Sequence, residues 1–307
     1  MADKPSRALM LCGDGLARFI EPSHSYIHIN SLASNACCGF LSLPNAPPSE
    51  TEDERIVREF AQLLDACDDT KALISERFMG MRSAIITNNS SLKSFCGKVG
   101  LTVMHINEII RINHSLAQSP VPVDAVACEL LKLLGFEQGK ALEESQFDIV
   151  FVHIGAGEKV NGENDNATAD DMESINDLIG NIMLIAQPGS EIGSRLHLSL
   201  VMSYGSISDN DDPKFSVLTI RSETSPDLSF LFPRQSYTMK GEISRNNVRH
   251  HCPMLISQWQ YAVTRKDMVN TFTFEDFKEH GGNLVIPADR YLHEVAFKLW
   301  KAPKYGA

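Results

Sequence analysis

The amino-acid sequence predicts an α/β fold with a largely parallel central sheet and helices on both faces. Short apolar runs, typical of strands buried on both faces of a sheet, alternate along the chain with segments of helical periodicity. The length of 307 residues, with 43% hydrophobic and 22% charged residues, lies in the range of globular proteins. A chain of this size can bury a large core, and we expect a single domain over residues 1–307.

The first predicted strand is the run ALMLC at residues 8–12, which stops at the turn Gly13-Asp14-Gly15 as a central strand would. Further apolar runs predict strands at 83–87, 102–106, 147–154, 196–202, 216–220 and 254–257. Helical periodicity predicts helices at 52–66, 91–100, 124–134, 170–186 and 287–300. Thr51 and the three carboxylates after it favour a helix start, and Pro188-Gly189 favours a helix end.

Charge and cysteine usage limit the possible partners. The formal net charge of −11 opposes binding to a nucleic-acid backbone or an anionic membrane. The seven cysteines, an odd number without a C-x-x-C pair, indicate free thiols in a reducing compartment. The first apolar run is too short for a signal-peptide core, and no later segment approaches the length of a membrane span. We therefore expect a cytoplasmic protein without nucleic-acid or membrane partners.

Polar loops at residues 155–168 and 203–213 follow apolar strands, at the positions where open α/β sheets place their binding crevices. Asp14 stands at a similar position, between two glycines that allow a sharp turn and the close approach of a ligand. Its carboxylate is a candidate ligand of a divalent metal, although Gly-Asp-Gly is also a common turn sequence.

Ser49 precedes the acidic helix start and has two interpretations. A hydroxyl at a helix N-terminus can accept a phosphoryl group when a metal lowers its pKa, because backbone N–H groups face the incoming phosphate. The alternative is that Ser49 or Thr51 caps the helix.

Three further residues have metal-binding chemistry. Glu158, in the loop after the strand at 147–154, is a possible oxygen ligand. His250 and His251 lie beside a cysteine, but adjacent residues on a strand point to opposite faces and seldom bind one ion together.

Several segments, taken in order, carry a resemblance to a known family. They are ALMLCGDG at 8–15, INSLASNACCG at 29–39, PPSET at 47–51, FDIVFVHI at 147–154, FEDF at 274–277, GGNL at 281–284 and KYGA at 304–307. In this order they resemble the alkaline phosphatase superfamily, and more closely its archaeal-type, cofactor-independent phosphoglycerate mutases. The resemblance covers most of the chain and implies an alkaline-phosphatase-like fold.

By this resemblance, two divalent metals held by aspartates and histidines at strand ends would assist a serine that takes the phosphoryl group. Asp14 matches the family's first aspartate and Ser49 its nucleophile. The family's next metal-binding loop appears as EKVNG at 158–162, so that Glu158 stands for an aspartate and Gly162 for a histidine.

Other positions also depart from the family. An aspartate-histidine pair appears as Ser203-Tyr204, whose hydroxyl groups are poor ligands for zinc or manganese. His250 or His251 lies near the family's upstream histidine. The stretch 65–80 leaves little room for the family's inserted cap domain, so we expect this domain to be reduced or absent. Nearby arginines form either a phosphate site or ion pairs with neighbouring glutamates, and they are Arg55, Arg58, Arg77 and Arg82.

Two functions follow as hypotheses. The first is a phosphoglycerate-mutase-like pseudoenzyme that has lost two-metal phosphoryl transfer and serves a binding or scaffold role, because several expected ligands are replaced. The alternative is an active metal-dependent phosphatase or phosphoglycerate mutase with Ser49 as phosphoryl acceptor. The expected cofactor is none, or a single divalent cation (Mn, Zn or Mg) if the site is retained. Possible partners are a protein or a phosphorylated small molecule, and residues 225–249 form either an inserted hairpin or a partner-binding segment.

Overall fold

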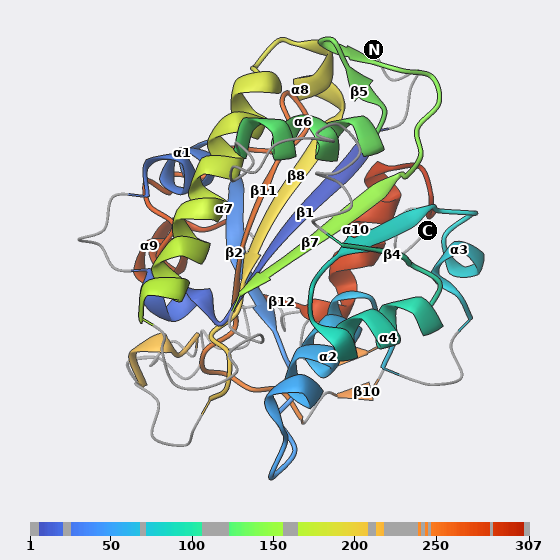
Figure 1. Cartoon of the computed structure of the whole chain (residues 1–307). Coiled ribbons are helices and arrows are strands. Elements are labelled where there is room, and N and C mark those ends of the chain that lie inside the picture. The colour runs from blue at the N-terminus through green and yellow to red at the C-terminus, as the bar shows by residue number, and fades with distance from the viewer. Residues whose placement is uncertain are drawn as a thin grey trace.

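The predicted α/β fold is confirmed by a computed structural model (Figure 1). The described residues are 6–20, 26–67, 72–105, 123–155, 165–207, 213–217, 239–240, 243–244, 247–282 and 285–303. Their centre is an eight-stranded sheet with the order β12-β2-β11-β8-β1-β7-β3-β4. Only β11 runs antiparallel to its two neighbours, so the sheet is largely parallel as predicted.

The strands lie close to their predicted places. The sheet consists of β1 (Arg7–Asp14), β2 (Cys37–Ser42), β3 (Ser83–Ile86), β4 (Thr102–Met104), β7 (Ile149–Gly155), β8 (Leu196–Met202), β11 (Met254–Trp259) and β12 (Val285–Pro287). Every residue of β1 and β8 is buried, which explains the apolar run at residues 8–12 of β1 and the largely apolar sequence of β8. Most of the strand predicted at 216–220 lies outside the described residues. Its first residue, Ser216, is described and forms an isolated bridge with His251.

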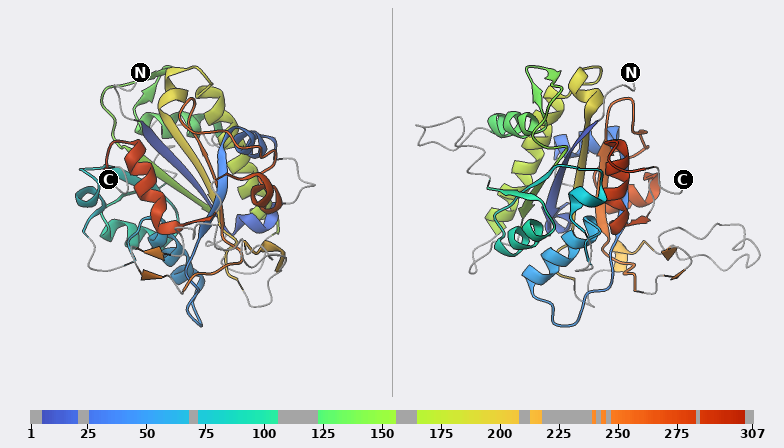
Figure 2. Two further views of the ribbon diagram at one scale, coloured as in Figure 1. Left: turned by 180° about the vertical axis from the view of Figure 1, so that it is seen from behind. Right: turned by 90° about the vertical axis from the view of Figure 1, so that its right-hand side faces the viewer.

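Helices cover both faces of the sheet and complete two apolar cores. One core includes side chains of α1 (Ile27–Asn35), α6 (Val123–Leu133), α7 (Asp165–Ile185) and α9 (Phe274–His280). The other includes side chains of α2 (Glu52–Leu63), α4 (Ser90–Lys98) and α10 (Tyr291–Lys298). Figure 2 shows α7 and α10 on opposite sides of the sheet. Among the described residues, no helix is both long and apolar enough to cross a membrane.

The parallel register brings the carboxyl ends of the central strands together. Asp14 at the end of β1 pairs with Gly155 of β7, and Gly13 pairs with Met202 of β8. The residues that follow β8 therefore lie beside Asp14. Because α2 packs on one face of the same strands, its first turns reach this edge of the sheet.

Local sequence signals account for most helix ends. Thr51 caps α2 in a capping box with Glu54, as the acidic start predicts. The helix predicted at 287–300 begins later, because Pro287 is the extended last residue of β12. A 3-10 turn, η6 (Ala288–Arg290), then leads into α10.

Several elements were absent from the sequence prediction, among them β2 and α1. The strand β2 contains two cysteines and a glycine, and α1 contains serine and asparagine, which are weak formers of strand and helix respectively. Their buried apolar residues are fixed by packing against the sheet and α7 rather than by local preference.

The stretch predicted to be a remnant of the cap insertion is short. Between α2 and β3 its described residues hold one helix of four residues, α3 (Ile74–Arg77). Within residues 225–249, two short strands, β9 (Met239–Lys240) and β10 (Ile243–Ser244), pair antiparallel, and most of the rest lies outside the described residues.

The central strands should dominate the stability of the fold. Leu200 of β8 has no exposed surface, so we expect Leu200→Ala to lower the free energy of unfolding by about 2–5 kcal/mol in urea denaturation, through lost burial and a residual cavity. Leu184 of α7 is 65% exposed, and Leu184→Ala should change the free energy of unfolding by less than about 0.5 kcal/mol. Equal effects of the two substitutions would contradict this assignment of the core.

Candidate functional site

The Asp14 carboxylate lies at the carboxyl edge of the sheet and is only 4% exposed. Gly15 follows it with φ 70°, a left-handed conformation that turns the chain sharply away from β1. Arg55 of α2 binds the carboxylate bidentately. Its Nη1 donates to Oδ1 at 2.9 Å, and its Nη2 donates to Oδ2 at 2.7 Å. Ser203 Oγ also donates to Oδ1 at 2.7 Å. Both oxygens of Asp14 therefore already accept strong hydrogen bonds.

Arg55 binds two further carboxylates from its own helix. Its Nε donates to Glu52 Oε2 at 3.0 Å and its Nη2 to Glu52 Oε1 at 2.5 Å, while Nη1 donates to Glu59 Oε2 at 3.0 Å. The spacing of three and four residues places both glutamates on the same face of α2 as Arg55. We call Asp14, Glu52, Arg55, Glu59 and Ser203 the Arg55 cluster.

The charges of the Arg55 cluster shift one another's pKa values. Burial acts to raise the pKa of Asp14, but the hydrogen bonds and charge of Arg55 hold it below its usual range. Burial also acts to lower the pKa of Arg55, and the carboxylates of Asp14 and Glu52 raise it further than burial lowers it. Burial raises the pKa of Glu59 to about 7 despite the neighbouring Arg55. The cluster thus keeps an ionised pair at its centre and one carboxyl group that titrates near neutral pH.

The side chains of Ser203 and Tyr204 lie in different environments, one beside Asp14 and the other in the apolar core. Ser203 Oγ accepts a hydrogen bond from the backbone N–H of Gly15 at 3.0 Å while it donates to Asp14. Tyr204 is 2% exposed and packs against Phe215, with 5.0 Å between ring centroids. The first residue of the predicted replacement pair belongs to the site, and the second belongs to the apolar core.

Ser49 is exposed and has a φ of 63°, an uncommon conformation for a serine. It precedes the capping residue Thr51 by two positions, so Ser49 is not the N-cap of α2. The first turn of α2 carries Glu52, Asp53 and Glu54, whose charges oppose an incoming phosphate group. The helix end near Ser49 is therefore electrostatically unfavourable for anions.

The other predicted metal ligands are not seen to join Asp14. Glu158 lies outside the described residues. His250 and His251 are half-buried, and their backbones pair with the segment at 216–217. Within the part of the chain that the structure describes, no group of three or more His, Cys, Asp or Glu side chains is placed to hold a metal.

All four arginines considered for a phosphate site bind carboxylates. Besides Arg55, the pairs join Arg58 to Glu50 at 2.6 Å, Arg77 to Asp65 at 2.9 Å and Arg82 to Asp148 at 3.1 Å. These contacts match the alternative interpretation of the arginines as partners of acidic side chains.

Glu59, Glu52 and Arg249 were not identified from the sequence as site residues. The spacing of Glu52, Arg55 and Glu59 was a visible signal, because such residues share one helix face. Arg249 carried no such signal, since it reaches Glu59 from 190 positions further along the chain, with 3.7 Å between its Nη2 and Oε1 of Glu59. Its Nη2 also donates to the carbonyl oxygen of Cys252 at 3.0 Å.

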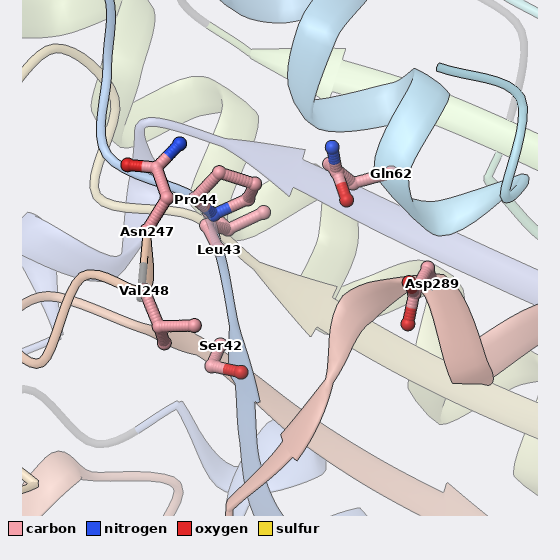
Figure 3. Close-up of a pocket in the computed structure, with 7 residues that line it drawn as sticks. All are labelled: Ser42, Leu43, Pro44, Gln62, Asn247, Val248 and Asp289. Carbon is pink, nitrogen blue, oxygen red and sulfur yellow. The ribbon is translucent and has the colours of Figure 1, made fainter. Parts of the chain in front are cut away.

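A cavity of about 250 Å³ opens at the carboxyl end of β2 (Figure 3). Gln62 of α2 and Asp289 of η6 face the strand end, with Asn247 on the far side. The remaining lining residues are Ser42, Leu43, Pro44 and Val248. None of these seven residues is cationic, so the cavity suits a polar uncharged group or a cation better than a phosphate.

Comparison with known proteins agrees with this fold. No protein-family model matches the sequence, and no curated protein is similar to it in sequence. Among solved structures, PH0037 protein from Pyrococcus horikoshii has a TM-score of 0.51 and 11% identity, with 99% of each chain covered. The chain therefore shares the overall α/β fold of that structure.

Two other similar structures match at lower TM-scores. The cofactor-independent phosphoglycerate mutase from Thermoplasma acidophilum DSM 1728 has a TM-score of 0.38 and 10% identity, over 75% of this chain and 40% of that one. A protein in the alkaline phosphatase superfamily from Vibrio parahaemolyticus has a TM-score of 0.43 and 9% identity, over 85% of this chain and 61% of that one.

The pKa of Glu59 predicts a pH dependence of stability. A free glutamate titrates near 4.5, whereas burial raises the pKa of Glu59 in the folded protein to about 7. Between these values the folded state binds more protons than the unfolded state, so Glu59 makes the free energy of unfolding fall as pH rises from 4.5 to 7. We expect Glu59→Gln to remove this contribution, which is of the order of 1–3 kcal/mol.

Urea denaturation of the wild type and Glu59→Gln across this pH range measures the contribution. The matched control is Glu279→Gln, whose side chain is 77% exposed. The free energy of unfolding of Glu279→Gln should depend on pH in the same way as that of the wild type. Parallel profiles for the wild type and Glu59→Gln would show that Glu59 is ionised throughout the range.

Proposed function

We propose that this chain is a phosphoglycerate-mutase-like protein that lacks two-metal phosphoryl-transfer activity and serves a binding or scaffold role. The observation that carries the proposal is the bidentate bond between Arg55 and Asp14. Asp14 is the only predicted metal ligand in the described part of the chain that stands at the central strand ends, and both its oxygens are occupied.

A divalent cation at Asp14 does not fit the residues around it. It would have to displace the guanidinium of Arg55 or share the carboxylate with a positive charge at hydrogen-bond distance, which is strongly repulsive in a buried site. Ser203 Oγ donates to Asp14 and accepts from the backbone N–H of Gly15, so its hydroxyl is already engaged as both donor and acceptor. The donor set thus supports binding of an arginine at this position instead of a metal.

The surroundings of Ser49 also support the loss of phosphoryl transfer. A serine hydroxyl needs a metal or a base to become nucleophilic near neutral pH. Ser49 is exposed beside a helix turn that carries three carboxylates, which disfavour both the phosphate group and the developing negative charge.

We propose a protein partner in preference to a phosphorylated small molecule. All four arginines considered for a phosphate site are engaged by carboxylates, and the cavity in Figure 3 has no cationic lining residue. The short connection between α2 and β3 supports the further proposal that the cap domain is reduced to a remnant.

The alternative function is an active phosphatase or phosphoglycerate mutase with a rebuilt site and a single Mn, Zn or Mg ion. One observation favours it: strained backbone conformations cluster at functional sites, and Ser49 has a positive φ. This function requires Arg55 to leave Asp14, so that Asp14 and Glu158 are free to bind the cation.

Metal analysis and an activity assay distinguish the two functions. We expect protein purified without chelators to hold far less than one equivalent of Mn or Zn and to release no phosphate from aryl phosphates or phosphoglycerates, even with added Mn, Zn or Mg. Close to two equivalents of metal, together with turnover that Ser49→Ala abolishes, would overturn the proposal. One equivalent with the same Ser49-dependent turnover would establish the alternative.

A further inference from the structure

We propose that a groove between α2 and α4 binds a protein partner, which inserts the apolar face of a helix flanked by lysine or arginine side chains. This inference rests on the proposed function and deepens it, because it assigns a surface to the protein partner. The two helices lie side by side (Figure 1), and the groove between them has a volume of about 550 Å³.

One side of the groove is a single face of α2. The lining residues from this helix are three adjacent pairs at intervals of four positions, Asp53-Glu54, Val57-Arg58 and Ala61-Gln62. Residues four positions apart on a helix lie one above the other. At 1.5 Å per residue, the face from Asp53 to Gln62 is about 13 Å long, which matches roughly two to three turns of a partner helix.

Apolar side chains make up much of the lining. Val57 of α2 and Phe95 of α4 are half-buried, so part of each side chain remains open to solvent. Ala61 and Ala66 are buried, and their small side chains leave room for an inserted group. Apolar surface bordered by polar side chains is typical of protein-protein contact sites. A helix fills a groove of this kind with apolar anchors at positions i, i+3, i+4 and i+7.

Two exposed carboxylates in the lining have no basic partner. Asp53 accepts hydrogen bonds from Asn89 Nδ2 at 2.9 Å and from Ser91 Oγ at 3.0 Å. Glu54 accepts from the backbone N–H and the hydroxyl of Thr51, both at 2.8 Å, and these bonds hold its pKa below the usual range. All of these donors are neutral. Among the described residues, no basic side chain is paired with either carboxylate, so both negative charges remain uncompensated.

The charge of the groove favours a basic partner. Arg58, the basic side chain in the lining, is neutralised by Glu50, which accepts from its Nε at 2.6 Å and from its Nη2 at 2.9 Å. The groove therefore has an excess of negative charge from Asp53 and Glu54, which complements lysine or arginine beside the apolar anchors of a partner. A second copy of this chain is a poor occupant, because two chains with a formal net charge of −11 repel one another.

Fluorescence polarisation with defined peptides tests the groove. The probe is a labelled peptide of about 14 residues made of leucine and lysine, with leucines at i, i+3, i+4 and i+7 so that one helix face is apolar. A second peptide has glutamate in place of every lysine. A third has the composition of the first, but its leucines are ordered so that no apolar face forms. The second peptide tests the charge of the groove, and the third tests its apolar lining.

We expect the leucine-lysine peptide to bind the wild type with a dissociation constant of about 100 µM or lower. The other two should bind at least about tenfold more weakly, because one places like charges against Asp53 and Glu54 and the other lacks apolar anchors. Raising the salt concentration from about 50 to 300 mM should weaken the leucine-lysine complex, since the charges at the groove are exposed.

Two variants locate the binding site. Val57→Lys places a positive charge within the groove and should lower the affinity for the leucine-lysine peptide by about tenfold or more. Asp53→Asn/Glu54→Gln keeps the shape of both side chains but removes their charges. It should weaken binding by about tenfold and reduce the dependence on salt.

The matched control is Glu191→Gln/Glu279→Gln, which also removes two exposed negative charges. These residues belong to α8 (Glu191–Arg195) and α9, which lie away from α2 in Figure 1. The control should bind the leucine-lysine peptide as the wild type does. If Val57→Lys does not fold, Gln62→Lys repeats the test, because Gln62 is half-buried on the same face of α2.

Equal affinity for the leucine-lysine and leucine-glutamate peptides, or binding that a lysine in the groove leaves unchanged, would overturn the inference. A wild-type dimer in analytical ultracentrifugation that Val57→Lys dissociates would also overturn it, because the occupant would then be a second copy of this chain. A metal-free, inactive wild type that does not bind the leucine-lysine peptide refutes this inference alone. A wild type that holds two metals and turns over substrate refutes the proposed function instead.

Discussion

The ion pair between Asp14 and Arg55 fastens the central strand of the sheet to the helix that covers it. Both groups are almost completely buried, so each depends on the other for the solvation that water no longer provides. Removing one partner of such a pair typically costs about 3–5 kcal/mol, because a buried charge is left without compensation. Hydrogen bonds from α2, from the turn after β1 and from the chain after β8 converge on this one pair.

Sheet topology explains why these groups meet. Three neighbouring parallel strands, β7, β1 and β8, end in register, so the residue after each strand enters the same small region. Successive residues leave a strand in opposite directions. Ser203 can therefore bond to Asp14 while Tyr204 packs in the core on the opposite face.

The sequence contained enough information for the architecture and for part of the site. The largely apolar segment at residues 196–202 is buried along its whole length, as expected of a strand covered on both faces, and β8 was predicted residue for residue. β2 was missed because its glycine and cysteines have little strand preference, and its pairing with β11 decides its conformation. Asp14 was identified by its place at a strand end, whereas its partner was not. Arg55 lies 41 positions away on a helix, where an arginine is usually a solvated partner of nearby glutamates, and only the packing of α2 turns it inward.

A fold that places carboxylates at buried strand ends must neutralise them, and physical chemistry offers three means: a bound cation, a basic side chain or a proton. The Arg55 cluster uses the last two. Asp14 and Glu52 pair with Arg55, and Glu59 lies between Arg55 and Arg249. Burial raises the pKa of Glu59 to about 7, so it can take a proton near neutral pH. The cluster is therefore close to neutral without any metal. This balance explains how a site rich in carboxylates can remain buried with a basic side chain at Asp14, and why an added divalent ion would leave the cluster with excess positive charge.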